Sequence, residues 1–377
     1  MNNARLLWLL LCALPLLANA QQLNDTTRHQ LSLLATADVY YAAFNTDLPE
    51  NGLAPFNTVG PRDNTISLNV AQVGLSHTGP KTRANFTYQI GDIPLVAWSP
   101  EFPNVQAANA GFLVAGDWWV DAGFFSTHIG YESFLPRQKY LSSAAYISFN
   151  EPFYQAGVRA SGSFTDKLSA QVWLLNGYNI FVDNNAGKSV GIRLNYQYGE
   201  RGSLTYNNLL GKEQPDDQAT QFRQTHNLFI SQKFADRLTV VANVTVAHQT
   251  NTGRRATSED ATMHGAFLTL SYAINERFSL AGRAEYFSDE QGYISGPVPG
   301  VGFDPDTDDF PQTGVALAAG SLSAEYRPTP DAYLRAETRF TRQGDDMRLF
   351  VDGSTRRDYQ TALLLTAGVS FGRDVLW

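Results

Sequence analysis

Several long stretches of this sequence alternate apolar and polar residues with a period of two. Residues 190–198 place Val, Ile, Leu and Tyr at every second position, with Gly, Arg, Asn and Gln between them. Similar alternation is found in residues 84–90, 238–246 and 266–274. Successive side chains of a β-strand point to opposite faces, so each stretch predicts a strand with one apolar and one polar face. Helical periodicity is absent, which indicates an all-β fold.

The connections between these strands alternate in length. Short turns occupy residues 165–167, 199–202, 235–237, 275–277 and 328–330, whereas the links at 45–64, 130–152, 211–222, 289–314 and 343–357 are long and rich in Gly, Pro, Asn and Asp. Outer-membrane barrels have short turns at the periplasmic end and long loops at the outer end. The alternation therefore predicts a transmembrane antiparallel β-barrel.

The predicted strands can be placed along most of the chain. They cover residues 30–44, 64–77, 82–92, 109–115, 118–128, 153–164, 167–177, 187–198, 202–211, 223–234, 237–249, 261–274, 277–288, 315–327, 331–343 and 357–371. This makes about sixteen strands, and an even count returns both termini to the periplasmic side. Fourteen or eighteen stay open, because 109–115 is short and 64–77 changes phase between Val70 and Ala71, which indicates a β-bulge.

The beginning of the chain matches a cleaved secretion signal. Arg5 precedes a Leu-rich stretch over residues 6–17, and Ala18 and Ala20 supply the small residues that a signal peptidase requires. We therefore expect a signal peptide at 1–20, a periplasmic segment at 21–29 and the barrel at 30–377. Beyond the signal, no run of about 20 apolar residues could cross a bilayer as a helix.

Charge and composition narrow the function. The chain has 28 Lys+Arg against 36 Asp+Glu, a net charge of −8, and no basic block, which argues against nucleic-acid binding. The single cysteine, Cys12, lies in the predicted signal, and the six histidines lack the spacing of a zinc site. No Gly-x-Ser-x-Gly motif is present. We accordingly predict no catalytic residues, no metal and no cofactor.

Aromatic residues cluster near the predicted strand ends. The residues that flank short turns are Phe164, Tyr198, Phe234 and Phe278. The residues near the opposite ends of their strands are Tyr40, Tyr41, Phe124 and Phe125. Membrane barrels carry aromatic girdles at both interfaces, so this distribution predicts outward-facing rings at the two rims.

The middle third of the chain resembles a known family of outer-membrane β-barrel porins, the OmpL-like family. The matching segments are HIGYE at 128–132, PFYQAGVR at 152–159, FTDKL at 164–168, LNGYN at 175–179 and KSVG at 188–191. The resemblance implies a passive diffusion channel, with no catalytic residues to carry over. It fades through the acidic loop after residue 296. The chain also departs from the usual barrel ending, because the alternation stops at Phe371, before the final Trp377.

Charged residues in the polar register define a predicted pore wall. They are Arg159, Arg193, Arg283, Glu285, Glu325, Arg327, Arg335, Glu337 and Arg339. An Arg that faced lipid would cost about 2 to 4 kcal/mol at the bilayer midplane, so this register is assigned to the lumen. The excess of arginine over glutamate favours anions, or else the charges pair and brace the interior. The sequence leaves both interpretations open.

Two kinds of loop bear on the pore. The stretch 130–152 follows the fifth predicted strand, where many sixteen-stranded porins fold a loop inward. By this analogy Glu132, Arg137 and Lys139 are constriction candidates. The outer loops are acidic and contain Asp216, Asp217, Glu259, Asp260, Asp304, Asp306, Asp308, Asp309, Asp345 and Asp346. These loops could gather cations, although the cluster at 304–308 lacks the glycine and distal glutamate of a calcium loop.

These observations together predict a porin of the bacterial outer membrane. It would pass small hydrophilic solutes or ions by diffusion, contact membrane lipid, and possess no enzymatic activity. A homo-oligomer stays open. The alternative is a plugged surface barrel that acts in adhesion or scaffolding. An outer-membrane barrel hydrolase, with a triad assembled from distant strands, is the less favoured alternative.

Overall fold

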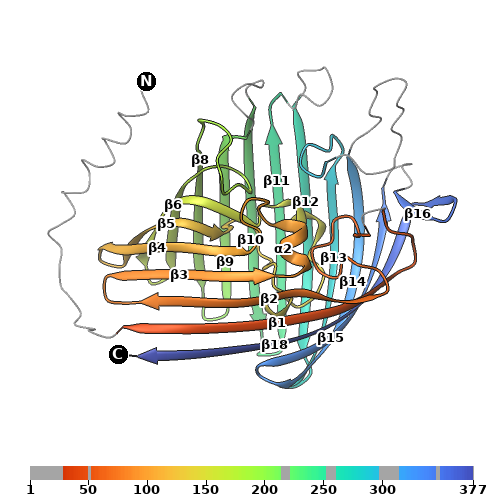
Figure 1. The fold of residues 1–377 in the computed structure, drawn as a ribbon, viewed down its shortest axis with the longest axis horizontal. Helices are drawn as coiled ribbons and strands as arrows, with labels where there is room; N and C mark the ends of the chain where they lie inside the picture. The colour runs from red at the N-terminus through yellow and green to blue at the C-terminus, as the bar shows by residue number, and fades with distance from the viewer. Residues whose placement is uncertain are drawn as a thin grey trace.

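The computed structural model describes residues 29–49, 52–213, 221–251, 260–296, 314–344 and 349–376. Sixteen antiparallel strands form one closed barrel, in which successive strands pair and β18 closes the sheet against β1 (Figure 1). The predicted fold and strand count are therefore confirmed. The predicted signal at 1–20 lies outside the described residues.

The barrel contains all strands except β16 and β17, which form a separate hairpin in the loop before β18. The strands are β1 (Gln30–Phe44), β2 (Thr65–Thr78), β3 (Thr82–Ile90), β4 (Val105–Ala115), β5 (Trp118–Ser126), β6 (Tyr154–Thr165), β7 (Leu168–Leu175), β8 (Ser189–Tyr198), β9 (Gly202–Lys212), β10 (Phe222–Phe234), β11 (Leu238–Gln249), β12 (Ala261–Ala273), β13 (Phe278–Asp289), β14 (Val315–Thr329), β15 (Ala332–Gln343), β16 (Phe350–Asp352), β17 (Thr355–Arg357) and β18 (Tyr359–Leu376).

Two strand ends differ from the prediction by more than two residues. β4 begins at Val105 because that residue pairs with Tyr88 of β3, although its first residues do not alternate cleanly. β18 does not stop at Phe371 but runs to Leu376, which pairs with Gln30 at the start of β1. Pairing with β1 thus extends the last strand beyond its apolar alternation. Trp377 lies outside the described residues.

The predicted bulge in β2 is present, close to the expected position. Asp38 of β1 pairs with Val70 and Val39 pairs with Leu68, which leaves Asn69 as the extra residue. The buried Asn69 side chain donates to Asp38 Oδ1 at 2.7 Å and accepts from the Gly60 amide at 2.9 Å. The bulge therefore turns an amide into the barrel, where it holds the first long loop.

Strand faces follow the sequence alternation. In β12, Leu268, Leu270 and Tyr272 point outward and are exposed, whereas Thr269 and Ser271 are buried on the inner face. The girdle prediction holds for Phe164, Phe234 and Phe278, which are exposed beside the short turns. It is wrong for Tyr40 and Phe125, which are buried and face inward. Tyr40 donates to Asp92 at 2.7 Å, and Phe125 contacts an arginine.

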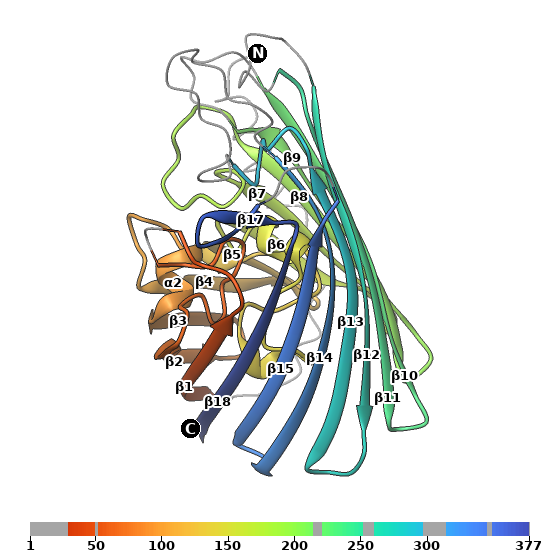
Figure 2. The same ribbon diagram turned by 90° about the vertical axis from the view of Figure 1, so that its right-hand side faces the viewer.

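Two long connections carry short helices. The connection after β3 contains α2 (Asp92–Ala97), and the connection after β5 contains η2 (Pro136–Gln138) and α3 (Tyr146–Asn150). Residues 127–153, called here the inward loop, enter the barrel and contact strands on its far side (Figure 2). Among the described residues, no helix has the length and apolar character needed to cross a membrane.

A substitution at Gly123 would test how tightly the inner wall is packed. It has a φ of 132°, and a Cβ there would lie 2.2 Å from the carbonyl oxygen of Ala108. Because such backbone strain costs about 1 to 3 kcal/mol and the clash adds to it, Gly123→Val should lower the yield of folded, heat-modifiable barrel severalfold. The control is Ala122→Val on the exposed outer face. Equal yields would contradict this account.

Candidate pore and inward loop

The inward loop is fixed to the wall by buried charged groups of β15. The Glu337 carboxylate accepts hydrogen bonds from the Ser142 amide at 2.5 Å, the Ser143 amide at 3.1 Å and the Ser143 hydroxyl at 2.5 Å. Arg335 donates to the carbonyl oxygens of Lys139 at 2.7 Å and Pro136 at 3.0 Å. These bonds satisfy backbone groups of an irregular segment that is buried away from water.

Opposite charges pair beneath the loop. Arg283 lies 2.9 Å from Glu132 of the inward loop and 3.1 Å from Glu285, which also binds Arg339 at 2.8 Å. Glu325 binds Arg335 at 2.5 Å, and Arg327 at 2.6 Å. All these groups are buried except Arg327, whose side chain is 40% exposed. The geometry matches the bracing interpretation for this side of the barrel.

Apolar contacts fill the same side of the lumen. Ala145, Tyr146 and Ile147 of the inward loop belong to one buried cluster with inward-facing side chains of β11–β14, including Phe267 and Phe287. The guanidinium of Arg339 lies 3.7 Å from the centre of the Tyr146 ring. The Tyr146 amide donates to Glu285 at 2.6 Å. Loop and wall thus form a packed core on this side of the barrel.

The three constriction candidates all lie in the inward loop, in different surroundings. Glu132 is buried, but the Arg283 charge outweighs this burial and holds the pKa of the carboxyl below its usual range. Burial lowers the pKa of Lys139 to about 8, against the opposing charge of Glu132. Arg137 donates to the carbonyl oxygens of Pro330, at 2.6 Å, and Asp331 in the turn between β14 and β15. The loop therefore reaches from the outer end of the barrel to a short turn.

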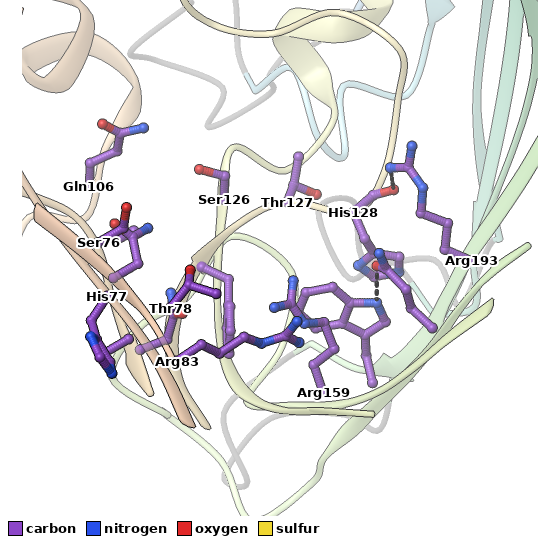
Figure 3. A pocket seen from close by; sticks show the side chains of 17 residues that line it. Ser76, His77, Thr78, Arg83, Gln106, Ser126, Thr127, His128, Arg159 and Arg193 are labelled. Carbon is purple, nitrogen blue, oxygen red and sulfur yellow. Dashed lines mark hydrogen bonds between the residues drawn. The ribbon is translucent and has the colours of Figure 1, made fainter. Parts of the chain in front are cut away.

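The other side of the lumen contains a cavity of about 590 Å³ (Figure 3). Its wall comes from β2–β8 and from the first residues of the inward loop. Arg83, Arg159 and Arg193 lie along it, together with polar side chains such as Gln106 and Asn109. This cavity is the candidate pore.

Positive charge predominates in the candidate pore. Arg83 and Arg159 share the buried Asp121, at 2.5 Å and 2.9 Å. Arg193 donates to the His128 carbonyl at 3.3 Å, and no carboxylate of the described residues lies within 4 Å of it. Burial lowers the pKa of the His128 imidazole to about 4, so that ring is neutral at pH 7. Among the described residues, the candidate pore therefore has three guanidinium groups, of which Arg83 and Arg159 share the carboxylate of Asp121 and Arg193 has none.

Aromatic rings support these arginines. Arg83 lies 4.5 Å from the centre of the Trp119 ring, and Arg159 lies 5.1 Å from that of Phe125 and 5.2 Å from that of Trp173. A cation over an aromatic face is stabilised by about 0.5 to 2 kcal/mol. The stacking holds long, flexible side chains in defined positions along the cavity.

The residues predicted from sequence separate into two groups. Arg159 and Arg193 line the cavity, whereas Arg283, Glu285, Glu325, Arg335, Glu337 and Arg339 lie in the inner register under the inward loop, with Arg327 at its edge. Sequence reasoning missed Arg83 and Asp121. The alternation in residues 83–89 predicts a polar strand face that contains Arg83. The predicted pore wall nevertheless does not include this residue.

The acidic outer loops lie largely outside the described residues. This holds for Asp216, Asp217, Glu259, Asp304, Asp306, Asp308, Asp309, Asp345 and Asp346. Asp260 is described, and its carboxylate lies 3.3 Å from the ring of His248. The prediction that these loops gather cations stays untested.

Comparison with protein families decides the classification. The family described as "Putative beta-barrel porin-2, OmpL-like" matches residues 30–371, from the start of β1 into β18. The chain belongs to this family. It is therefore a porin-type channel of the bacterial outer membrane, and the predicted resemblance is confirmed. No curated protein matches the sequence significantly.

Solved structures with the same fold share little sequence with this porin. The outer-membrane OmpT of Vibrio cholerae is 11% identical, with 91% of this chain and 98% of that chain covered and a TM-score of 0.58. The anion-selective porin from Comamonas acidovorans is 11% identical over 91% and 100%, with a TM-score of 0.57. The channel DcaP of Acinetobacter baumannii is 11% identical over 93% and 100%, with a TM-score of 0.55.

Glu337 provides a test of the loop anchor. Glu337→Ala removes the acceptor of three hydrogen bonds, each worth about 1.5 to 3 kcal/mol when the acceptor is charged. We expect the inward loop to detach locally, so that trypsin cleaves after Arg137 or Lys139 at least about tenfold faster, as measured by mass spectrometry. Thr338→Ala, on the outer face, is the control. Unchanged cleavage in Glu337→Ala would argue against the anchor.

Glu151 makes the stability of the barrel depend on pH. Its carboxyl accepts from Thr245 at 2.5 Å, and burial raises its pKa from the ordinary glutamate range to about 8. The protonated carboxyl thus contributes stability that is complete below the unfolded pKa and is lost as pH rises through the folded pKa. Between about pH 5 and about pH 9, the wild-type Tm should fall by several degrees more than that of Glu151→Gln.

The glutamine variant keeps the acceptor for Thr245 but cannot ionise. Heat-modifiable migration in gels measures both Tm values, with Glu101→Gln as the exposed control. If wild type and Glu151→Gln lose stability in parallel over this range, Glu151 is not the titrating group.

Proposed function

We propose that this porin passes small hydrophilic anions by diffusion through the cavity beside the inward loop. The observation that carries the proposal is that Arg83, Arg159 and Arg193 line one cavity, where Asp121 pairs with the first two and no carboxylate of the described residues pairs with Arg193. A pore lined by unbalanced guanidinium groups lowers the electrostatic energy of an anion and raises that of a cation. Transport requires no catalytic group, so we infer that the protein is not an enzyme.

The paired charges under the inward loop are assigned a different role. Arg335 and Arg339 are 2% and 3% exposed and donate to glutamates. We infer that this group of residues braces the loop and acts on selectivity only through the width of the passage. Glu132, Arg137 and Lys139 then define the side of the constriction that does not carry the unbalanced charge.

A plugged barrel is the second candidate, because side chains of the inward loop pack into the lumen against β11–β14. In that case the barrel would serve adhesion or scaffolding. Discrete conductance steps in a planar bilayer support the channel, whereas a folded barrel without conductance supports the plugged form. We also propose a homo-oligomer, since a similar structure, that of Vibrio cholerae OmpT, is described as a trimer form.

Selectivity is tested by two substitutions of opposite charge effect. Arg193→Gln removes a positive charge without leaving a buried carboxylate unpaired, so the reversal potential across a salt gradient should shift toward cations. Asp121→Asn removes the negative charge and should shift it toward anions by a similar amount. Since Arg342 is exposed on the outer face, Arg342→Gln is the control and should leave the potential unchanged.

Unchanged potentials in both pore variants would remove the basis for anion preference. A wild-type channel that prefers cations would also overturn it, and would point instead to the acidic outer loops.

A further inference from the structure

A second cavity, of about 340 Å³, lies among the long connections at the outer end of the barrel. Trp98 follows α2, Phe149 and Phe153 come from the inward loop, and Tyr178 and Tyr293 come from the connections after β7 and β13. Its volume is at the lower end of the range for small-molecule sites, about 300 to 1,000 Å³. The cavity therefore has the size and aromatic lining of a binding site.

Arg223 of β10 supplies the positive charge in this cavity. Its guanidinium lies 4.7 Å from the centre of the Tyr178 ring and 5.5 Å from that of Tyr293. Its Nε donates to Gln249 at 2.8 Å. Within the described part of the chain, neither Nη atom has a hydrogen-bond acceptor and no carboxylate lies within 4 Å. A guanidinium with free donors in a cavity is suited to an anionic ligand.

The two tyrosines that flank Arg223 are held by their own anchors. The Tyr178 amide donates to Glu213 at 2.8 Å, and its hydroxyl donates to the Asn150 carbonyl. The Tyr293 amide donates to Asp289 at 3.2 Å. Because these contacts fix the Tyr178 ring and the Tyr293 backbone before any ligand arrives, binding would require little further ordering of this part of the cavity.

The carboxylates near the cavity already accept hydrogen bonds from other groups of the protein. Glu151, which lines the cavity, accepts from Thr245 of the barrel wall. Glu213 accepts from the Tyr178 amide and from the Ser189 hydroxyl at 3.0 Å. Burial raises the pKa of both carboxyls, which favours their neutral forms and weakens repulsion of an anion.

We propose that this outer cavity binds monoanionic carboxylates that carry an aromatic ring. The guanidinium of Arg223 can form two parallel hydrogen bonds to one carboxylate, and Trp98, Phe149 and Phe153 can contact the ring. A single cation matches a single charge better than a phosphate or a dicarboxylate. A role in delivering such solutes to the pore rests on the proposed channel, whereas binding itself does not.

The test is calorimetric titration of the detergent-folded protein with benzoate. We expect saturable binding to the wild type, and an affinity about tenfold or more lower for Arg223→Gln. Acetate, which lacks the ring, and benzamide, which lacks the charge, should bind at least about tenfold more weakly than benzoate. Arg193→Gln is the matched control, because it removes one positive charge from the pore and leaves this cavity intact.

Two results would overturn the proposal. One is an absence of benzoate binding to a folded, heat-modifiable wild-type barrel, and the other is equal affinity in wild type and Arg223→Gln. If Arg223→Gln does not fold, Tyr293→Leu replaces it, since loss of one stacked ring should also weaken benzoate binding. A channel that conducts but does not bind benzoate would refute this site and leave the proposed function standing.

Discussion

The arrangement of the lumen depends on the buried guanidinium of Arg283. It bonds to Glu132 of the inward loop, to Glu285 of its own strand, and to the Ser143 carbonyl at 3.0 Å. A buried charge costs several kcal/mol unless all its donors are used, and removal of one partner from such a pair costs about 3 to 5 kcal/mol. The inward loop therefore has one strongly favoured position. The cavity lies on the side of the lumen that the loop leaves open.

The sequence predicts the barrel well because membrane and geometry impose one simple rule. Each strand must place apolar residues outward and polar residues inward, so Leu268 and Thr269 reveal their faces from position alone. Strand ends are less certain, since pairing partners decide them. β18 continues to Leu376 through its ladder with β1, although the apolar pattern ends earlier. Tyr40 and Phe125 were misplaced because local pattern cannot tell an interface aromatic from one that packs inward.

The candidate pore was only partly predictable, for a physical reason. The position of a residue in a strand shows whether its side chain faces the lumen. It does not show whether that side chain lies under the inward loop or along the cavity. Arg283 and Arg159 share the inner register, yet one is sealed under the inward loop and the other lines the cavity. Asp121 was missed because Trp119 and Phe125 occupy the same face of β5 and hide its polar character. In the folded barrel these aromatic rings contact arginines of neighbouring strands, and the sequence pattern does not show these contacts.

In the proposed function, local charge, and not net charge, decides what the pore attracts. The chain carries −8 overall, with much of its acid in the outer loops. At physiological ionic strength, however, exposed charges are screened beyond about 8 Å, while groups in a narrow, low-dielectric passage are screened much less. Arg193 has no acidic partner within 4 Å among the described residues, and its position in the passage gives its charge more influence than a distant surface aspartate. In the proposed function, the acidic residues of the outer loops act on approach to the mouth, and the arginines of the candidate pore act on passage through it.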